Sequence, residues 1–119
     1  MMRVRGLNHV SLRIRDLDRS RAFYEDLVGL TQAPRPDLGF PGVWYQIGPS
    51  QLHLLAGETR MEPIDPTGPH FAVEVPSVEE VRQGLEARGI PYLAFGATQL
   101  WIRDPDGNVV EVIQSDAPR

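Results

Sequence analysis

The sequence contains neither cysteine nor lysine. Without cysteine, the chain can form no disulfide bond, no thiolate metal site and no cysteine nucleophile. All twelve basic residues are arginine, so Schiff-base chemistry on lysine is excluded as well. Covalent chemistry through a thiolate or a lysine amine is therefore ruled out before any pattern is considered.

Long apolar runs and basic runs are also missing. No stretch approaches the roughly 20 residues of a membrane helix, and the opening MMRVRGLNHVSLRIRD resembles neither a signal peptide nor a transit peptide. We therefore expect a cytoplasmic protein with no membrane partner. The formal net charge of −4, with no basic cluster, argues against a nucleic-acid partner. The 119 residues are enough for one compact domain with its own core.

The predicted elements occur in the same order twice, as strand, helix, strand, strand, strand. A linker at 57–69, rich in proline and without periodicity, separates the two copies. We therefore predict a single domain over 1–119, with a first module at 6–56 and a second at 70–115. Strands are expected at 7–14, just after residue 30, at 43–47 and 51–56, and then at 70–75, 91–95, 99–103 and 108–114.

Each module contains one amphipathic helix after its opening strand. The first helix is predicted to be capped by Asp16 or Asp18, to end near Gly29 and to include Ala22 in its apolar face. The second begins at Ser77, which has a glutamate three residues later, as in a capping box. The predicted fold class is therefore α+β: two βαβββ modules in tandem, with mixed sheets that form a shared concave site.

Potential metal ligands recur at related places in the two modules. His9 and His70 begin the opening strands, while His53 and Glu111 lie in the closing strands. In each strand the ligand faces away from the apolar stripe that would pack against the helix. Three imidazoles and one carboxylate suit a borderline divalent cation, so we predict one ion of Zn, Ni, Co, Fe or Mn per site.

A structural interpretation of the same residues stays open. A single histidine in a strand is commonly a hydrogen-bonded structural residue, and a strand glutamate is commonly solvated. His53 has an alternative in packing against Gln51 or Gln46. The metal hypothesis is favoured because the four positions are related by the repeat and include every histidine of the chain.

Four segments together resemble the vicinal oxygen chelate superfamily. They are LNHVSLRIRDLDRSRAFYEDLVGL, QLHLLAG, PHFAVEV and DPDGNVVEVIQ, and the resemblance extends over about 7–114. This superfamily includes glyoxalase I, fosfomycin-resistance thiol transferases, extradiol dioxygenases and bleomycin-resistance proteins. The resemblance implies the glyoxalase/bleomycin resistance fold.

The resemblance also implies site residues. The family's ligands match His9, His70 and Glu111, whereas His53 stands where glyoxalase I commonly has glutamate or glutamine. In the thiol transferases, the positions that match Ser11 and Trp101 lie near the substrate. Two arginines share strand faces with these residues and are candidates for holding a substrate carboxylate: Arg13 and Arg103.

The implied activity is metal-dependent isomerisation of the lactoylglutathione-lyase type. The metal would bind two adjacent oxygens of a small-molecule substrate, and Glu111 would act as the general base. The alternatives are an extradiol dioxygenase, a fosfomycin-type thiol transferase, and a protein that sequesters an antibiotic without catalysis.

Family members usually build each site from two half-units. We therefore expect a homodimer in which His9 and His53 of one chain meet His70 and Glu111 of the other. The linker at 57–69 is long enough to permit pairing within one chain instead, which stays the alternative.

Overall fold

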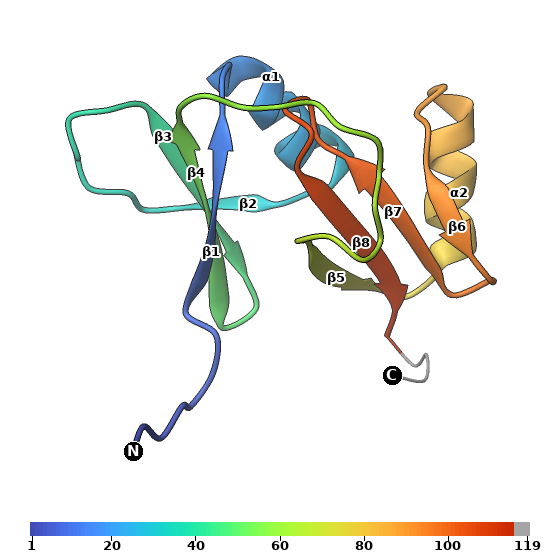
Figure 1. Cartoon of the computed structure of the whole chain (residues 1–119), viewed down its shortest axis with the longest axis horizontal. Coiled ribbons are helices and arrows are strands. Elements are labelled where there is room, and N and C mark those ends of the chain that lie inside the picture. The colour runs from blue at the N-terminus through green and yellow to red at the C-terminus, as the bar shows by residue number, and fades with distance from the viewer. Residues whose placement is uncertain (116–119) are drawn as a thin grey trace. The chain divides into compact units, whose positions relative to one another are not determined.

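The chain consists of two compact units that divide after Arg60, inside the predicted linker. The computed structural model describes residues 1–115, so the predicted domain over 1–119 extends beyond the described residues. Unit 1 covers Met1–Arg60 and unit 2 begins at Met61. Each unit contains one four-stranded mixed sheet and one helical segment (Figure 1), which confirms the predicted tandem α+β fold.

Unit 1 follows the predicted order, with its opening and closing strands side by side. β1 pairs with β4 in parallel, β4 with β3 and β3 with β2 in antiparallel fashion, so the sheet order is β1-β4-β3-β2. The elements are β1 (His9–Ile14), α1 (Leu17–Arg21), the π-helical segment η1 (Ala22–Leu27), β2 (Thr31–Ala33), β3 (Gly42–Ile47) and β4 (Ser50–Ala56).

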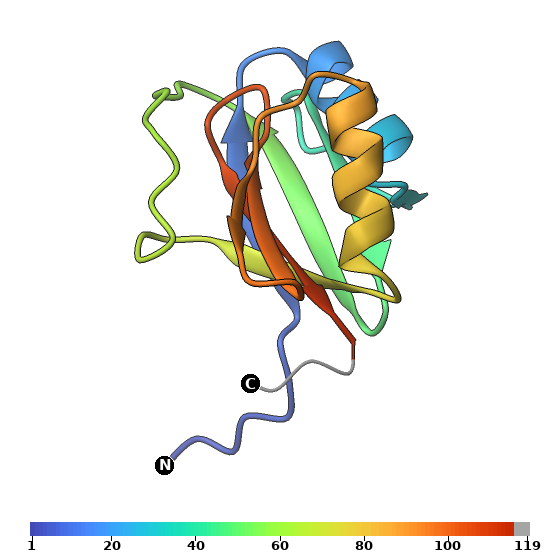
Figure 2. The same ribbon diagram turned by 90° about the vertical axis from the view of Figure 1, so that its right-hand side faces the viewer.

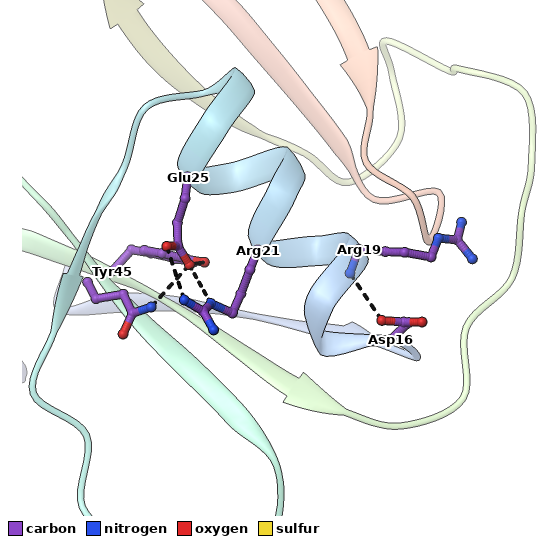
Figure 3. Close-up of polar contacts among 6 residues, drawn as sticks. Asp16, Arg19, Arg21, Glu25 and Tyr45 are labelled. Atoms are coloured by element: carbon purple, nitrogen blue, oxygen red, sulfur yellow. Dashed lines mark hydrogen bonds and ion pairs between the residues drawn. The ribbon is translucent and has the colours of Figure 1, made fainter.

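One of the two aspartates that were predicted to cap the helical segment of unit 1 does so. Asp16 is the N-cap, and its Oδ1 accepts a hydrogen bond from the backbone N–H of Arg19 at 3.0 Å (Figure 3). The predicted apolar face is wrong at Ala22, which is exposed. Ala22 lies two residues from each of the buried residues Ser20 and Tyr24, so it is roughly half a turn away from the buried side. Hydrogen bonding also changes at Ala22 from α-helical to π-helical.

A carboxylate network attaches this segment to the sheet (Figure 3). Glu25 Oε2 accepts hydrogen bonds from Tyr45 Oη at 2.9 Å, from Arg21 Nε at 2.7 Å and from Gln32 Nε2 at 3.1 Å. The hydrogen bond from Arg21, ahead of those from Gln32 and Tyr45, lowers the pKa of Glu25 to about 2. Burial and the same carboxylate raise the pKa of Tyr45. The network therefore joins η1 to β2 and β3.

Unit 2 repeats this topology, with the sheet order β5-β8-β7-β6 and a parallel β5–β8 pair. Ser77 caps its helix by accepting a hydrogen bond from the backbone N–H of Glu80. Figures 1 and 2 show this helix, α2, lying along its sheet. The elements are β5 (Phe71–Val75), α2 (Val78–Ala87), β6 (Leu93–Phe95), β7 (Gln99–Arg103) and β8 (Val109–Gln114).

The two helical segments end in the same way. Gly29 follows the first and Gly89 the second, at φ +82° and +65°. Only glycine adopts this left-handed conformation without strain, so each glycine ends its helix and turns the chain back toward the sheet.

Each sheet has one apolar face and one face that carries the candidate ligands. The apolar positions alternate along the strands, as the period of two requires. In unit 1 the buried apolar side chains are Ile14, Tyr24, Val43, Tyr45, Leu52 and Leu54; in unit 2 they include Val78, Leu85, Leu100, Ile102, Val110 and Val112. Among the described residues, no helix is long and apolar enough to cross a membrane.

The DPDG turn before β8 is built around a buried carboxylate. Asp104 Oδ1 accepts hydrogen bonds from the backbone N–H groups of Asp106 and Asn108, each at 2.8 Å. Its Oδ2 accepts from Asn108 Nδ2 at 2.8 Å. Because these bonds satisfy the turn internally, β8 begins at a defined residue, and Glu111 falls on the face opposite the helix.

Candidate metal centre

The parallel strand pairs bring the candidate ligands together two by two. In unit 1, Ser11 of β1 is the register partner of His53, so His9, two residues before Ser11, lies on the same face as His53. In unit 2, Ala72 is the register partner of Glu111, so His70 lies on the same face as Glu111. His70 itself precedes β5 by one residue, which corrects the prediction that all three histidines lie within strands.

In unit 1 the ligand face contains a column of three stacked rings. The His9 and His53 ring centroids are 4.1 Å apart with an interplanar angle of 16°. Trp44, which pairs with His53 in register, stacks on its other side at 4.0 Å and 5°. The imidazole of His53 is therefore held between two aromatic planes, and its ring edge is the part left to bind a ligand.

A relay of two glutamine amides orients the His53 ring. Gln46 Nε2 donates to the backbone carbonyls of Gly48 and Ser50 at 2.8 and 3.1 Å, which makes its Oε1 an acceptor. Gln51 Nε2 donates to that oxygen at 3.0 Å, and Gln51 Oε1 lies 2.8 Å from His53 Nε2. His53 Nε2 must therefore carry the proton, which leaves the lone pair on Nδ1.

The contact between Gln51 and His53 is the one expected if His53 has only a structural role. The same contact is also compatible with metal binding by His53. A metal-binding histidine usually donates its other ring N–H to an oxygen, and this partner sets the tautomer. The hydrogen bond to Gln51 is of that kind.

Burial and neighbouring positive groups keep His53 neutral. Desolvation is the largest cause that lowers the pKa of His53, and the charges of His9 and Arg35 lower it further. The ring therefore presents a lone pair at neutral pH, as a metal ligand must. Arg35, which lies in the loop between β2 and β3, was not among the predicted site residues, because a proline-rich loop has no periodicity from which to place a side chain.

In unit 2, His70 and Glu111 face each other directly. His70 Nε2 lies 2.9 Å from Glu111 Oε1, and His70 Nδ1 lies 2.8 Å from the carbonyl oxygen of Gly68. The carbonyl can only accept, so Nδ1 carries a proton, and in the neutral ring Nε2 then has the lone pair. A lone pair and a carboxylate oxygen at this distance repel each other unless a proton or a cation lies with them.

The surroundings of Glu111 hold its carboxylate in place. Gln99 Nε2 donates to Glu111 Oε2 at 3.1 Å, while Oε1 faces His70. Trp101 is the register partner of Glu111 and meets the His70 ring edge-on, with centroids 6.4 Å apart. Gln99 was not predicted as a site residue, although its alternation with Trp101 along β7 places both on this face.

The remaining predicted site residues belong to neither the His9–His53 pair nor the His70–Glu111 pair. Ser11 is exposed beside His53 in register, and Arg13 is exposed further along β1, with its side chain next to Gly57. Arg103 Nη1 donates to the carbonyl oxygen of Glu62 at 2.8 Å. One nitrogen of the Arg103 guanidinium is therefore already bonded to the backbone.

The donor atoms of the His70–Glu111 pair suit a divalent cation, whereas the stacked rings of His9 and His53 do not converge on one point in this arrangement. Two ligands at about 2.1 Å from one ion lie roughly 3 Å apart in octahedral geometry, close to the 2.9 Å between His70 Nε2 and Glu111 Oε1. Neutral imidazole and carboxylate are also the donors that Zn, Ni, Co, Fe and Mn accept. In the described part of the chain, however, no three candidate ligands lie close enough to hold a metal ion together. Each unit therefore supplies half of the predicted ligand set.

The sequence and the repeated fold match a known family. The family model described as the Glyoxalase/Bleomycin resistance protein/Dioxygenase superfamily matches residues 6–112. The chain belongs to this superfamily. Superfamily members generally use a divalent metal and act on small molecules.

Individual relatives agree with this assignment. Glyoxylase I 4 of Arabidopsis thaliana is 33% identical over 125 residues, which cover 94% of this chain and 72% of the relative. The structure of lactoylglutathione lyase from Agrobacterium tumefaciens is 26% identical, with a TM-score of 0.69 and coverage of 94% of this chain and 95% of its own. The fosfomycin resistance protein FosX from Listeria monocytogenes shares the fold at 17% identity, with a TM-score of 0.75 over 93% and 91% of the two chains.

Proposed function

We propose that this superfamily member is a metal-dependent enzyme that isomerises a small substrate bound through two adjacent oxygens, in the manner of lactoylglutathione lyase. The contact between His70 Nε2 and Glu111 Oε1 carries the proposal. When the His70 ring is neutral, its lone pair and the carboxylate face each other at 2.9 Å and form a site for a positive charge, which a proton or a metal cation can supply. The curated glyoxalase I relative and the lactoylglutathione lyase structure support the reaction type.

The ligand set that we propose contains His9, His53, His70 and Glu111. One divalent ion of Zn, Ni, Co, Fe or Mn would be held by these side chains and would stabilise negative charge on the substrate oxygens. His9 Nδ1 contacts Asn8 Oδ1 at 2.8 Å, and His70 Nδ1 contacts the Gly68 carbonyl, so both rings direct Nε2 toward the ligand side. His53 would bind through Nδ1.

Glu111 is the residue that we propose moves the proton. Its Oε1 faces the cation site, while the amide of Gln99 holds Oε2. When Oε1 leaves the ion, a carboxylate still held through Oε2 by Gln99 can take a proton from one substrate carbon and return it to the neighbouring carbon. Trp101, buried beside Glu111, excludes water from that side of the carboxylate.

Completion of the ligand set requires one copy of each unit. We propose a homodimer in which the pair His9–His53 of one chain and the pair His70–Glu111 of the other share the ion, with pairing inside one chain as the alternative. The support is that the four candidate ligands lie in two pairs, one in each unit. The stacked rings of His9 and His53 would have to turn relative to each other for both to bind one ion.

The decisive experiment combines metal analysis with a turnover assay. We expect one divalent ion per proposed ligand set in protein produced with several metals on offer, and isomerisation of a hemithioacetal by the loaded protein. Oxygen uptake on catechols without isomerisation would indicate a dioxygenase instead, and thiol addition to fosfomycin a transferase. Tight small-molecule binding without bound metal would indicate a sequestering protein and would contradict the proposal.

A further inference from the structure

The side chain of Arg35 returns from its loop to the ligand face of unit 1. A Cβ atom placed on Gly42 would lie 2.9 Å from Arg35 Nη2 and 3.2 Å from Arg35 Cζ. Gly42 is two residues before Trp44 on β3, so both occupy the same face of the sheet. The guanidinium therefore lies over the glycine, in space that any other residue at position 42 would fill.

The Arg35 guanidinium is held in this position by Phe40. Its Nη2 donates to the Phe40 carbonyl oxygen at 3.0 Å, and its Cζ lies 5.1 Å from the centre of the Phe40 ring. A guanidinium fixed by a hydrogen bond and a ring contact loses little further freedom on binding an anion, which favours recognition.

Two N–H donors on this face are buried without an acceptor. Neither Arg35 Nε nor Trp44 Nε1 has a hydrogen-bond partner among residues 1–115. A buried donor without an acceptor costs about 1–3 kcal/mol, and buried tryptophan N–H groups usually find one. Two such donors in one unit, beside the proposed ligand His53, indicate a place where a bound molecule supplies the acceptor.

The positive charge on the ligand face of unit 1 also favours a bound molecule that is negatively charged. The Arg35 guanidinium places a full positive charge on the ligand face of unit 1. Three neutral imidazoles and one carboxylate also leave a divalent ion with a net charge of +1. The two adjacent oxygens of the substrate would balance the charge of the ion, and a single carboxylate would balance the charge of Arg35.

We infer that Arg35 and Trp44 form a carboxylate-binding subsite beside His53, so that the enzyme acts on substrates carrying a carboxylate. The expectation that the substrate also carries two adjacent oxygens rests on the proposed function. The carboxylate subsite itself does not depend on that function. A planar carboxylate matches the Nε edge of a guanidinium and carries one negative charge, which the single positive charge of Arg35 balances. A phosphate carries more charge than one arginine can balance.

Calorimetric titration with two matched probes tests this inference. Catechol and 3,4-dihydroxybenzoate both present adjacent oxygens, and only the second has a carboxylate. We expect the protein as purified with its metal to bind 3,4-dihydroxybenzoate about tenfold more tightly than catechol, the usual effect of one charge-assisted hydrogen-bonded pair. Acetate should compete with this probe more effectively than inorganic phosphate.

Three variants identify the residues responsible. Arg35→Gln should remove the preference for the carboxylate, and Arg35→Lys should restore part of it because lysine keeps the charge and loses the planar fork. Trp44→Phe keeps a ring for the stack on His53 and should weaken the preference. Arg15→Gln, at an exposed position of the same unit, controls for the loss of a positive charge and should leave the preference unchanged.

The outcomes separate this inference from the proposed function. Equal binding of the two probes, a preference that survives Arg35→Gln, or stronger competition by phosphate would overturn the carboxylate subsite, even if metal-dependent binding of catechol upheld the proposed function. An Arg35-dependent preference in protein that retains no metal would uphold the subsite and contradict the proposed function. Failure of both probes to bind would count against both.

Discussion

Glu111 is the residue on which the proposed chemistry depends most closely. Its two oxygens have separate neighbours, since Oε1 faces His70 and Oε2 accepts from Gln99. A glutamine in its place keeps the size and one oxygen donor, so the change separates metal binding from proton transfer.

We predict that Glu111→Gln lowers kcat by at least about a hundredfold, because an amide cannot take up the substrate proton. Metal retention should fall much less, since the three imidazoles stay. The measurement is kcat together with elemental analysis of the same sample. Glu80→Gln, an exposed change on α2 of the same unit, should alter neither. Equal losses of turnover and metal in Glu111→Gln would show that the residue is only a ligand.

At the scale of elements, a single carboxylate network joins the helical segment of unit 1 to its sheet. Glu25 accepts from Tyr45, Arg21 and Gln32, which come from three different elements. Tyr45 and Trp44 are adjacent on β3 and point to opposite faces. The network on one face therefore helps to position the strand whose other face stacks on His53.

The network predicts a pH-dependent stability. The pKa of Glu25 is about 2 in the folded protein and near 4.3 in an unfolded chain. Its contribution is therefore fully present above about pH 4.3 and is lost as the pH falls toward 2. We expect Glu25→Gln to lower the free energy of unfolding by about 1 kcal/mol at pH 7, because Arg21 and Glu25 are partly exposed and solvent screens their attraction.

Urea unfolding followed by circular dichroism between pH 7 and pH 2 measures this difference. It should shrink to near zero at the acidic end, where the carboxylate of the unmodified protein is itself protonated. Glu86→Gln is the matched control in unit 2, since Glu86 accepts from the hydroxyl of Tyr92 at an exposed position and should contribute less than Glu25, with no dependence on pH in this range. A difference for Glu25→Gln that is constant with pH would contradict the assignment.

At the scale of the whole molecule, the four proposed ligands are divided between the two units. Unit 1 contains His9 and His53, and unit 2 contains His70 and Glu111. Because each pair of proposed ligands is held by contacts within its own unit, a substitution in one pair should leave the other pair unchanged.

This independence makes the proposed homodimer testable by complementation. His53→Ala and Glu111→Gln should each be inactive alone, but subunit exchange between them would create one intact site in every mixed dimer if sites form across chains. Random exchange should then recover about a quarter of the unmodified activity. The measurement is kcat after mixing, with sedimentation equilibrium to verify a mass of twice 13.3 kDa. No recovery in a mixture of exchanged dimers would place each site within one chain.

Local sequence information determined the order of the elements, their caps and the faces of the strands. Alternation with a period of two places His53 and Glu111 opposite the apolar face, and the structure has them there. These features depend on residues near one another in the chain, so they can be worked out without knowing which strands pair. Two details were predicted wrongly: His70 precedes β5, and Ala22 lies on the exposed side of its helical segment.

Tertiary structure alone decided which side chains meet. The pairing register brings Trp44 onto His53 and Glu111 beside Trp101. A loop without periodicity carries Arg35 back over Gly42. Such contacts join residues that are distant in sequence, and their geometry depends on strand register and on the course of loops. No local pattern encodes these two quantities, because the free energy that selects them comes from packing the whole unit.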